Sequence, residues 1–184
     1  MTHLTSQTGF VQSFRICEAS APWMQAGASA LRKQVFVQEQ ALFAGHDRDA
    51  IDDLAIPLVA IAENTANGPL VVGTVRIHEE TPGIWWGSRL AVAPQWRRVG
   101  KLGSELIKLA VGTARARGAV EFHAHVQKQN AVLFRRLHWV VAAEIDLHGR
   151  PHVHMLAGLE HYTPIDDPVA GWQISAPSPV EAGT

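Results

Sequence analysis

The sequence contains very little cysteine and tyrosine and no long apolar run. Its 184 residues include one cysteine, Cys17, and one tyrosine. A single cysteine cannot form an intrachain disulfide, so we expect a reducing compartment. No segment approaches the roughly 18 consecutive apolar residues of a membrane-spanning helix, and residues 1–12 lack the apolar stretch of a signal peptide. These absences predict a cytoplasmic protein with no membrane partner.

The chain also lacks a surplus of either charge. It carries 16 lysine and arginine residues against 17 aspartate and glutamate residues, so its formal net charge is −1. A strongly basic surface would be needed to attract nucleic acid, and no nucleic-acid partner is therefore expected. A hydrophobic content of 47% with 18% charged residues indicates a folded chain, long enough for one domain with a buried core.

The apolar residues follow strand-like and helix-like periods in turn. The Asn67-Gly68 pair predicts a hairpin, and a helix between two strands predicts that those strands are parallel. We expect a flexible segment at residues 1–12, a domain at residues 13–162 and an irregular tail at residues 163–184. Strands are predicted at residues 14–17, 58–62, 70–77, 84–92, 120–126, 139–145 and 153–159, and helices at residues 22–40, 99–117 and 130–137.

A strand, a basic loop and a helix follow one another between Ser88 and Arg117. The first amides of a helix have no partner within the helix, and the helix dipole adds partial positive charge there. Glycines let a ligand approach the backbone, and basic side chains add full charges. The segment therefore predicts a diphosphate site, with a simple basic turn at a surface helix as the alternative. Its cations and glycines are Arg97, Arg98, Gly100, Lys101 and Gly103.

Two familiar phosphate loops do not match this segment. A Walker loop requires a glycine where Gln95 stands and a serine or threonine where Leu102 stands. A dinucleotide-binding loop requires three glycines in a fixed register, and only two are present. Both of these nucleotide-binding classes are excluded.

A third phosphate loop does resemble it. Residues 90–94, Leu-Ala-Val-Ala-Pro, followed by the basic turn, resemble the acetyl-CoA motif of the GCN5-related N-acetyltransferases (GNAT). In the family pattern Arg/Gln-x-x-Gly-x-Gly/Ala, Arg98 and Gly103 match, whereas Lys101 replaces the first glycine and Gly100 lies one residue earlier. Residues 126–139 and 31–40 extend the resemblance, the latter to ElaA-like bacterial proteins and to acyl-homoserine-lactone synthases.

The resemblance implies a single-domain α/β (α+β) fold, the acyl-CoA N-acyltransferase fold. Its mixed sheet would have six or seven strands with helices on both faces. Its fourth and fifth strands, at residues 84–92 and 120–126, would splay apart to admit the pantetheine arm of acetyl-CoA, the implied co-substrate. The residues implied to contact it are Leu90, Ala91, Val92, Arg97, Arg98, Val99, Gly100, Lys101, Leu102, Gly103, Ser104, Asn130 and Phe134.

The acid–base residues are less clear from the sequence. The family usually places a tyrosine where Phe134 stands, and Phe134 has no hydroxyl to protonate the leaving thiolate. His125, near the end of a strand, is a candidate proton donor, although a packing role is also open. Glu39 and the acidic loop that contains Asp53 are candidates for the base that accepts the amine proton, although such a loop can also be merely solvated.

The implied activity is direct transfer of an acetyl group to a primary amine of a small molecule. Arg76, in an apolar strand, must either pair with an acid or bind a substrate carboxylate, so an amino acid-like substrate is open. The sequence also leaves open whether the protein forms a homodimer. Two alternatives are a non-catalytic acyl-CoA-binding module and a metal enzyme that uses the pairs His123/His125 and His152/His154, although we expect no metal.

Overall fold

A computed structural model describes residues 11–177 and shows one eight-stranded mixed sheet. The strand order is β6-β7-β5-β4-β3-β2-β1-β8; β4 and β5 are parallel, and all other neighbours are antiparallel. The strands are β1 (Val11–Glu18), β2 (Ile56–Ala62), β3 (Leu70–Thr81), β4 (Ile84–Val92), β5 (Glu121–Gln127), β6 (Trp139–Leu147), β7 (Arg150–Ala157) and β8 (Trp172–Pro177).

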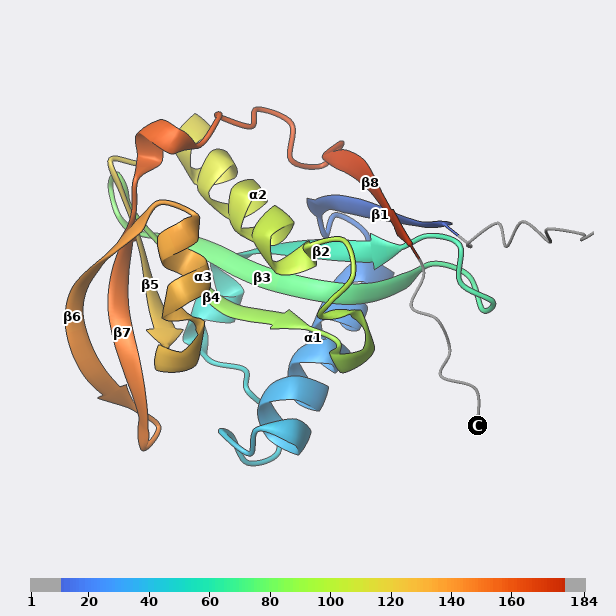
Figure 1. The fold of residues 1–184 in the computed structure, drawn as a ribbon, viewed down its shortest axis with the longest axis horizontal. Helices are drawn as coiled ribbons and strands as arrows, with labels where there is room; N and C mark the ends of the chain where they lie inside the picture. The colour runs from blue at the N-terminus through green and yellow to red at the C-terminus, as the bar shows by residue number, and fades with distance from the viewer. Residues whose placement is uncertain (1–10, 178–184) are drawn as a thin grey trace, which may run out of the picture.

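Three α-helices cover the sheet, with α2 and α3 on one face and α1 on the other (Figure 1). Alternate residues of β2 enter two different cores, as the pleat requires. Leu58 and Ala60 join the core beneath α2, and Val59 and Ile61 join the core beneath α1. The helices are α1 (Pro22–Arg32), α2 (Leu102–Ala116) and α3 (Ala131–Arg136); the shorter turns are η1 (Lys33–Glu39, a π-helix) and the 3-10 segments η2 (Ala50–Asp53), η3 (Pro94–Trp96), η4 (Lys128–Asn130) and η5 (Leu159–His161).

The mixed sheet with helices on both faces that the family resemblance implies is present (Figure 1), with eight strands where six or seven were expected, and the parallel pair β4–β5 is confirmed. The hairpin at Gly68, whose φ is +91°, is also present. The helix predicted at residues 22–40 is α-helical only to Arg32. Beyond it the backbone widens into η1, because the Gln40 amide donates to the Val35 carbonyl.

The predicted ends of the domain were wrong in two places. The tail expected to be irregular contains β8, which pairs with β1 from Val11↔Pro177 to Ile16↔Trp172 and becomes the eighth strand. Val11 and Gln12, expected to be flexible, already belong to β1, and residues 1–10 lie outside the described part of the chain. A six-residue strand among prolines carries little local signal, because its hydrogen bonds all come from a partner far away in the sequence.

Gly112 lies on α2 where the segment between β7 and β8 crosses this helix. A Cβ atom at Gly112 would lie 2.6 Å from Ile165 Cδ1 and 2.7 Å from the Thr163 carbonyl oxygen. The lack of a side chain at Gly112 therefore allows this crossing segment to lie on α2, where the Ile165 amide donates to the Gly112 carbonyl (Figure 1). None of the helices within residues 11–177 has the length and apolar character needed to span a bilayer.

Candidate functional site

The central feature of the site is a gap between β4 and β5. The two strands pair from Ile84↔Glu121 to Gly87↔Ala124 and then separate. A bulge bends β4 just beyond this point, because Arg89, with φ +57°, and Leu90 together face a single residue of β3. The splayed parallel strands expected from the family resemblance are therefore present, and the bulge accounts for their separation.

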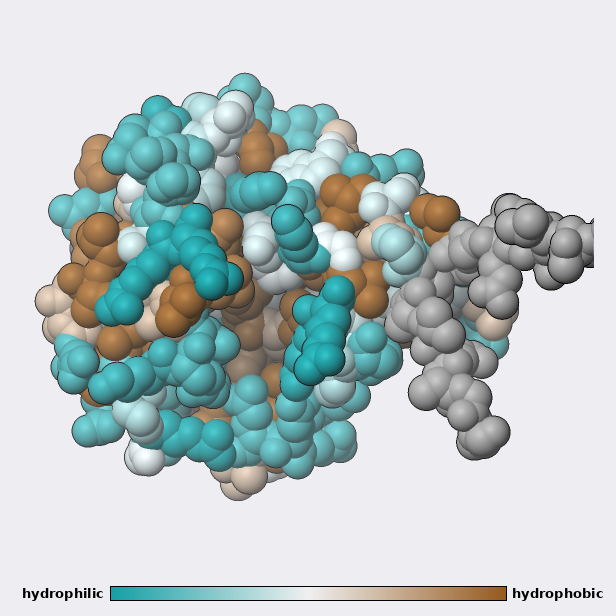
Figure 2. All heavy atoms as spheres, in the orientation of Figure 1, coloured by the Kyte–Doolittle hydropathy of each residue, from teal (hydrophilic) through white to brown (hydrophobic). Residues whose placement is uncertain are grey.

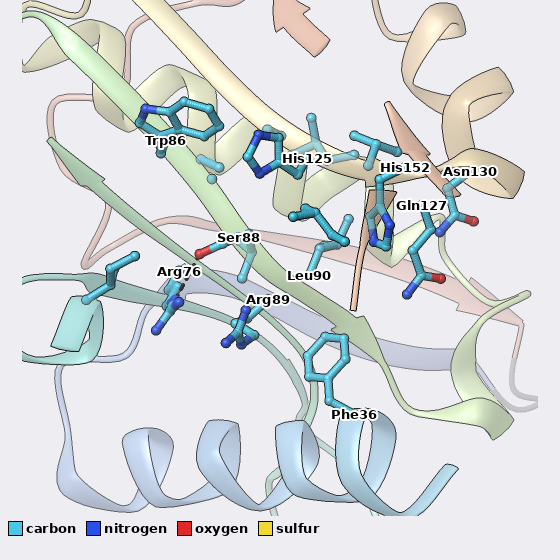
Figure 3. A pocket seen from close by; sticks show the side chains of 18 of the residues that line it. Phe36, Arg76, Trp86, Ser88, Arg89, Leu90, His125, Gln127, Asn130 and His152 are labelled. Carbon is cyan, nitrogen blue, oxygen red and sulfur yellow. Dashed lines mark hydrogen bonds between the residues drawn. The ribbon is translucent and has the colours of Figure 1, made fainter. Parts of the chain in front are cut away.

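A cavity of about 440 Å³ occupies this gap, a volume typical of small-ligand sites. Side chains from both faces of the sheet line it. Figure 2 views the face that carries α2 and α3 and shows a hollow with hydrophobic residues at its floor. Figure 3 shows the other side, where polar side chains of β3, β4, β5 and β7 converge. Four residues predicted for the site line the cavity: Leu90, His125, Asn130 and Phe134.

The loop between β4 and α2 turns sharply before the helix. Gly100 and Lys101 both have positive φ values, +62° and +53°, so α2 begins at Leu102 and not at Val99 as predicted. Val99 and Leu102 are buried and anchor the loop in the core. Among residues 11–177, no side chain caps the first turn of α2, so its leading amides are available to an anion.

The surface of this loop is open where a diphosphate would approach. A Cβ atom at Gly103 would meet no heavy atom within 4 Å. Arg98 and Lys101 are exposed and form no ion pair with any residue between 11 and 177. Ser104 follows in the same first turn of α2. Ala91 is buried, and Val92 is half-buried against the core and accepts a hydrogen bond from Arg97 at its carbonyl. Neither residue lines the cavity.

Arg97 and Glu39, predicted for different roles, bind each other. Both Nη atoms of Arg97 lie 2.7 Å from the Glu39 carboxylate oxygens, and its Nε donates to the Val92 carbonyl at 3.0 Å. The hydrogen bonds from Arg97 lower the pKa of Glu39. Glu39 is thus a poor proton acceptor outside the cavity lining, and the pair instead links η1 to the loop after β4.

Asp53, the third residue predicted to be catalytic, also lies away from the cavity. It pairs with Arg48, and both side chains are more than two-thirds exposed. The other aspartates of the acidic loop turn inward and meet three arginines, so three carboxylates face three guanidinium groups. The members of this cluster are Asp47, Asp49, Asp52, Arg32, Arg76 and Arg89.

Arg76 is the most deeply buried member of the cluster, with a side chain only 3% exposed. Its Nη atoms bind the two Asp49 oxygens at 2.7 and 2.9 Å, its Nη1 lies 2.8 Å from Asp52, and its Nε donates to Ser88 Oγ at 2.8 Å (Figure 3). Of the two roles open from the sequence, Arg76 therefore takes the pairing role.

The arginines keep the carboxylates of this cluster ionised. The hydrogen bond from Arg76 lowers the pKa of Asp49. Burial by itself would raise the pKa of Asp52, but hydrogen bonds from Arg32, the Asp49 amide and Arg76 outweigh it and hold the pKa below its usual range. Arg89 also stacks its guanidinium 4.5 Å from the Phe43 ring centroid. The loop is thereby held rigidly as one wall of the cavity, and of its aspartates only Asp49 contributes to the lining.

His125 is the predicted catalytic residue that reaches the cavity. Its ring lies 4.8 Å from Trp86 and 5.4 Å from His154 (Figure 3). Burial, and then the neighbouring histidines, lower the pKa of His125. No residue between 11 and 177 hydrogen-bonds its ring nitrogens. At neutral pH the imidazole is therefore uncharged and can accept a proton.

Sequence reasoning considered His152 only as a possible metal ligand, and it did not single out Gln127. They face each other across β7 and β5 and line the cavity next to Asn130 (Figure 3). His152 Nδ1 donates to the Arg150 carbonyl at 2.9 Å, which leaves Nε2 as the acceptor in the neutral ring. Asn130 precedes α3, but its side chain caps no amide and remains available to a ligand. The alternation of side chains along a strand predicts that the two histidines of β7 share one face. It does not predict that His152 lies beside Gln127, because that depends on which strands pair.

Some of the histidines considered as metal ligands are instead hydrogen-bonded to one another or to a neighbouring carboxylate. His123 Nδ1 lies 2.9 Å from His154 Nε2, and His123 Nε2 lies 2.8 Å from Glu121. Trp86 stacks on both rings. Within residues 11–177, no three His, Cys, Asp or Glu side chains are grouped so that they could hold a metal ion.

Comparisons with known proteins agree with this geometry. The model of the acetyltransferase (GNAT) family matches residues 20–138. Escherichia coli ElaA is 18% identical, with a TM-score of 0.64 over 79% of this chain and 99% of its own. An acyl-CoA N-acyltransferase from Pseudomonas aeruginosa is 16% identical, with a TM-score of 0.62 over 80% and 99%. The CoA-dependent acyl-homoserine lactone synthase BjaI is 18% identical, with a TM-score of 0.60 over 79% and 82%. A search of curated proteins finds no match.

Proposed function

Because this chain belongs to the acetyltransferase (GNAT) family, we propose that it transfers an acetyl group from acetyl-CoA to a primary amine of a small molecule. The observation that carries the proposal is the cavity in the gap between the parallel strands β4 and β5. The start of α2 follows β4 through a loop in which the side chains of Arg98 and Lys101 are exposed. A diphosphate at this loop would let the thioester end of the co-substrate enter the gap.

The reaction we propose is a direct displacement. The amine nitrogen attacks the thioester carbonyl carbon, a C–N bond forms and the C–S bond breaks. The amine proton passes to a base, and the departing CoA thiolate takes up a proton from water, so the products are an amide and free CoA. Holding both reactants in the cavity supplies much of the rate enhancement, because attack then becomes effectively unimolecular.

His125 is our candidate for the base. Its low pKa keeps the imidazole neutral, and it lies on the polar side of the cavity. The ionised carboxylates of Asp49 and Asp52 are already paired with arginines, and their lowered pKa values make them weak acceptors for the proton of the amine. Phe134 offers no hydroxyl for the thiolate, and for this reason we propose water as the proton donor.

The first test combines an amine panel with the double variant Arg98→Ala/Lys101→Ala. Release of CoA from acetyl-CoA, measured as free thiol, should depend on a particular class of primary amine. The double variant should weaken CoA binding by about 10- to 100-fold, because hydrogen bonds to charged groups contribute about 1.5–3 kcal/mol. Lys33→Ala/Arg48→Ala removes two exposed cations outside the cavity and is the matched control. Unchanged CoA affinity in the first variant would refute the loop assignment.

The same panel tests the second candidate, a non-catalytic acyl-CoA-binding module. Phe134, which stands where the family usually has a tyrosine, favours this candidate because it removes the usual proton donor. Tight acetyl-CoA binding without thiol release for any amine would support the module and contradict the transferase.

The pH dependence of the reaction tests the role of His125. Since the pKa of His125 is lowered from its usual value near 6.5, its neutral form prevails above that pH. We expect kcat/KM to be insensitive to this group at pH 7 and to fall as the pH drops through the lowered pKa. His125→Gln should remove this acidic limb and lower kcat by about 10²- to 10⁴-fold, the usual contribution of a general base. His46→Gln, at an exposed histidine outside the cavity, should change neither. An unchanged acidic limb in His125→Gln would assign the base elsewhere.

A further inference from the structure

Glu80 is a carboxylate of the cavity lining that has no cationic partner within residues 11–177. The other acidic and basic groups of the lining, Asp49, Arg76 and Arg89, belong to the cluster in which three carboxylates face three guanidinium groups. That cluster as a whole carries no net charge. A ligand in the polar part of the cavity therefore meets a negative charge at Glu80 that no side chain of the described residues offsets.

The Glu80 carboxylate is exposed, but it is held in place. Its Oε2 accepts a hydrogen bond from the Trp86 indole N–H at 3.0 Å. Trp86 is in turn stacked on His123 and His154, with ring centroids 4.9 and 5.3 Å apart. The second oxygen, Oε1, has no hydrogen-bond partner among residues 11–177. Glu80 thus offers a free and oriented acceptor to a ligand in the cavity.

The same indole connects Glu80 to the proposed base. The Trp86 ring lies 4.8 Å from the His125 ring, so a ligand that contacts both Glu80 and His125 need extend only past this indole (Figure 3). His78 also lines the cavity, two residues before Glu80 on β3. Burial, and then Arg76, lower the pKa of His78, so its ring is uncharged at neutral pH, as is that of His125. Neither imidazole therefore neutralises Glu80.

We infer that the acceptor is a diamine, or another amine with a second cationic group, and that Glu80 binds the second cation. The inference rests on the proposed function, because the reacting amine must lie beside His125 at the β4–β5 gap. The reaction is the displacement proposed above: the amine near His125 attacks the thioester, while the distal ammonium keeps its protons and binds Glu80. A molecule acetylated once has only an uncharged amide to place at Glu80, so the monoacetylated product should accumulate.

The experiment compares three amines with the same four-carbon chain: n-butylamine, putrescine and γ-aminobutyrate. Their distal groups are a methyl, an ammonium and a carboxylate. With acetyl-CoA as donor, kcat/KM measured as thiol release should be about tenfold higher for putrescine than for n-butylamine, a modest value for a charged contact because Glu80 is exposed. It should be lowest for γ-aminobutyrate, because the arginines of the lining are already paired. Mass spectrometry should find one acetyl group on putrescine.

Two outcomes separate this inference from the proposed function. Thiol release that is no faster with putrescine than with n-butylamine, or fastest with γ-aminobutyrate, would overturn the inference and leave the proposed function standing. No release with any amine of the wider panel would overturn both.

Substitutions at Glu80 locate the second cation. Glu80→Gln keeps the shape and removes the charge, and it should abolish the preference for putrescine over n-butylamine. Glu80→Lys should make γ-aminobutyrate the better substrate of the two charged amines. Glu79→Gln is the matched control, because Glu79 is the preceding residue of β3, is also exposed and does not line the cavity. A preference for putrescine that survives both Glu80 variants would place the second cation elsewhere and overturn the inference.

Discussion

Arg76→Leu is expected to lower the free energy of unfolding by about 3–5 kcal/mol, the usual cost of removing one partner from a buried ion pair. Arg76 holds two carboxylates and one hydroxyl in a setting where its side chain is 3% exposed. Without it, Asp52, whose side chain is 10% exposed, keeps its charge with one arginine fewer. Urea denaturation followed by tryptophan fluorescence measures the change.

The matched control lies in the same acidic loop. Arg48→Ala breaks the pair with Asp53, in which the side chains are 67% and 69% exposed. Water already solvates both charges, so this variant should change the free energy of unfolding by less than about 1 kcal/mol. Similar losses for the two variants would show that burial does not decide the strength of this network.

Gly103→Glu is expected to weaken CoA binding by about 100-fold while leaving the protein at least as stable. The position has open space for a side chain, and an acidic residue in the first turn of a helix is favoured by the helix dipole. The same carboxylate would repel a diphosphate and block the leading amides of α2. Calorimetric CoA titration and a thermal melt separate the two effects.

Gly103→Gln is the control for size. It has nearly the same volume without the charge and should weaken binding less than Gly103→Glu does. Wild-type CoA affinity in Gly103→Glu would mean that the diphosphate does not lie at the start of α2. The proposed function would then need another route for the co-substrate into the cavity.

The parts of the fold that depend on local pattern were predictable. The apolar strand at Ile84–Val92, the helical spacing after Leu102 and the alternation in residues 120–126 predicted the parallel crossover that the structure contains. β8 was missed, because it pairs with β1, more than 150 residues earlier in the chain. The bulge at Arg89 and Leu90 was also not predicted, since nothing in those residue types requires a positive φ.

The sequence predicted the roles of the charged residues of the site least well. Glu39 and Arg97 both looked available in the sequence, yet they form a bidentate pair across 58 positions of the chain. Asp53 is indistinguishable by type from Asp47, Asp49 and Asp52, but it points outward while they meet arginines. Composition reveals which charges exist, but a sequence pattern does not show which of them neutralise each other.

By itself, the sequence determined the family, the mixed sheet and the loop before α2, because periodicity and short motifs are carried by neighbouring residues. Only the tertiary structure decided that His125, Gln127 and His152 share one polar wall and that Phe122, Phe134 and Trp139 enclose an apolar one. The physical reason is distance along the chain. The shape of a cavity, and the charged side chains that remain available there, depend on packing and ion pairing between segments that meet only when the sheet is assembled.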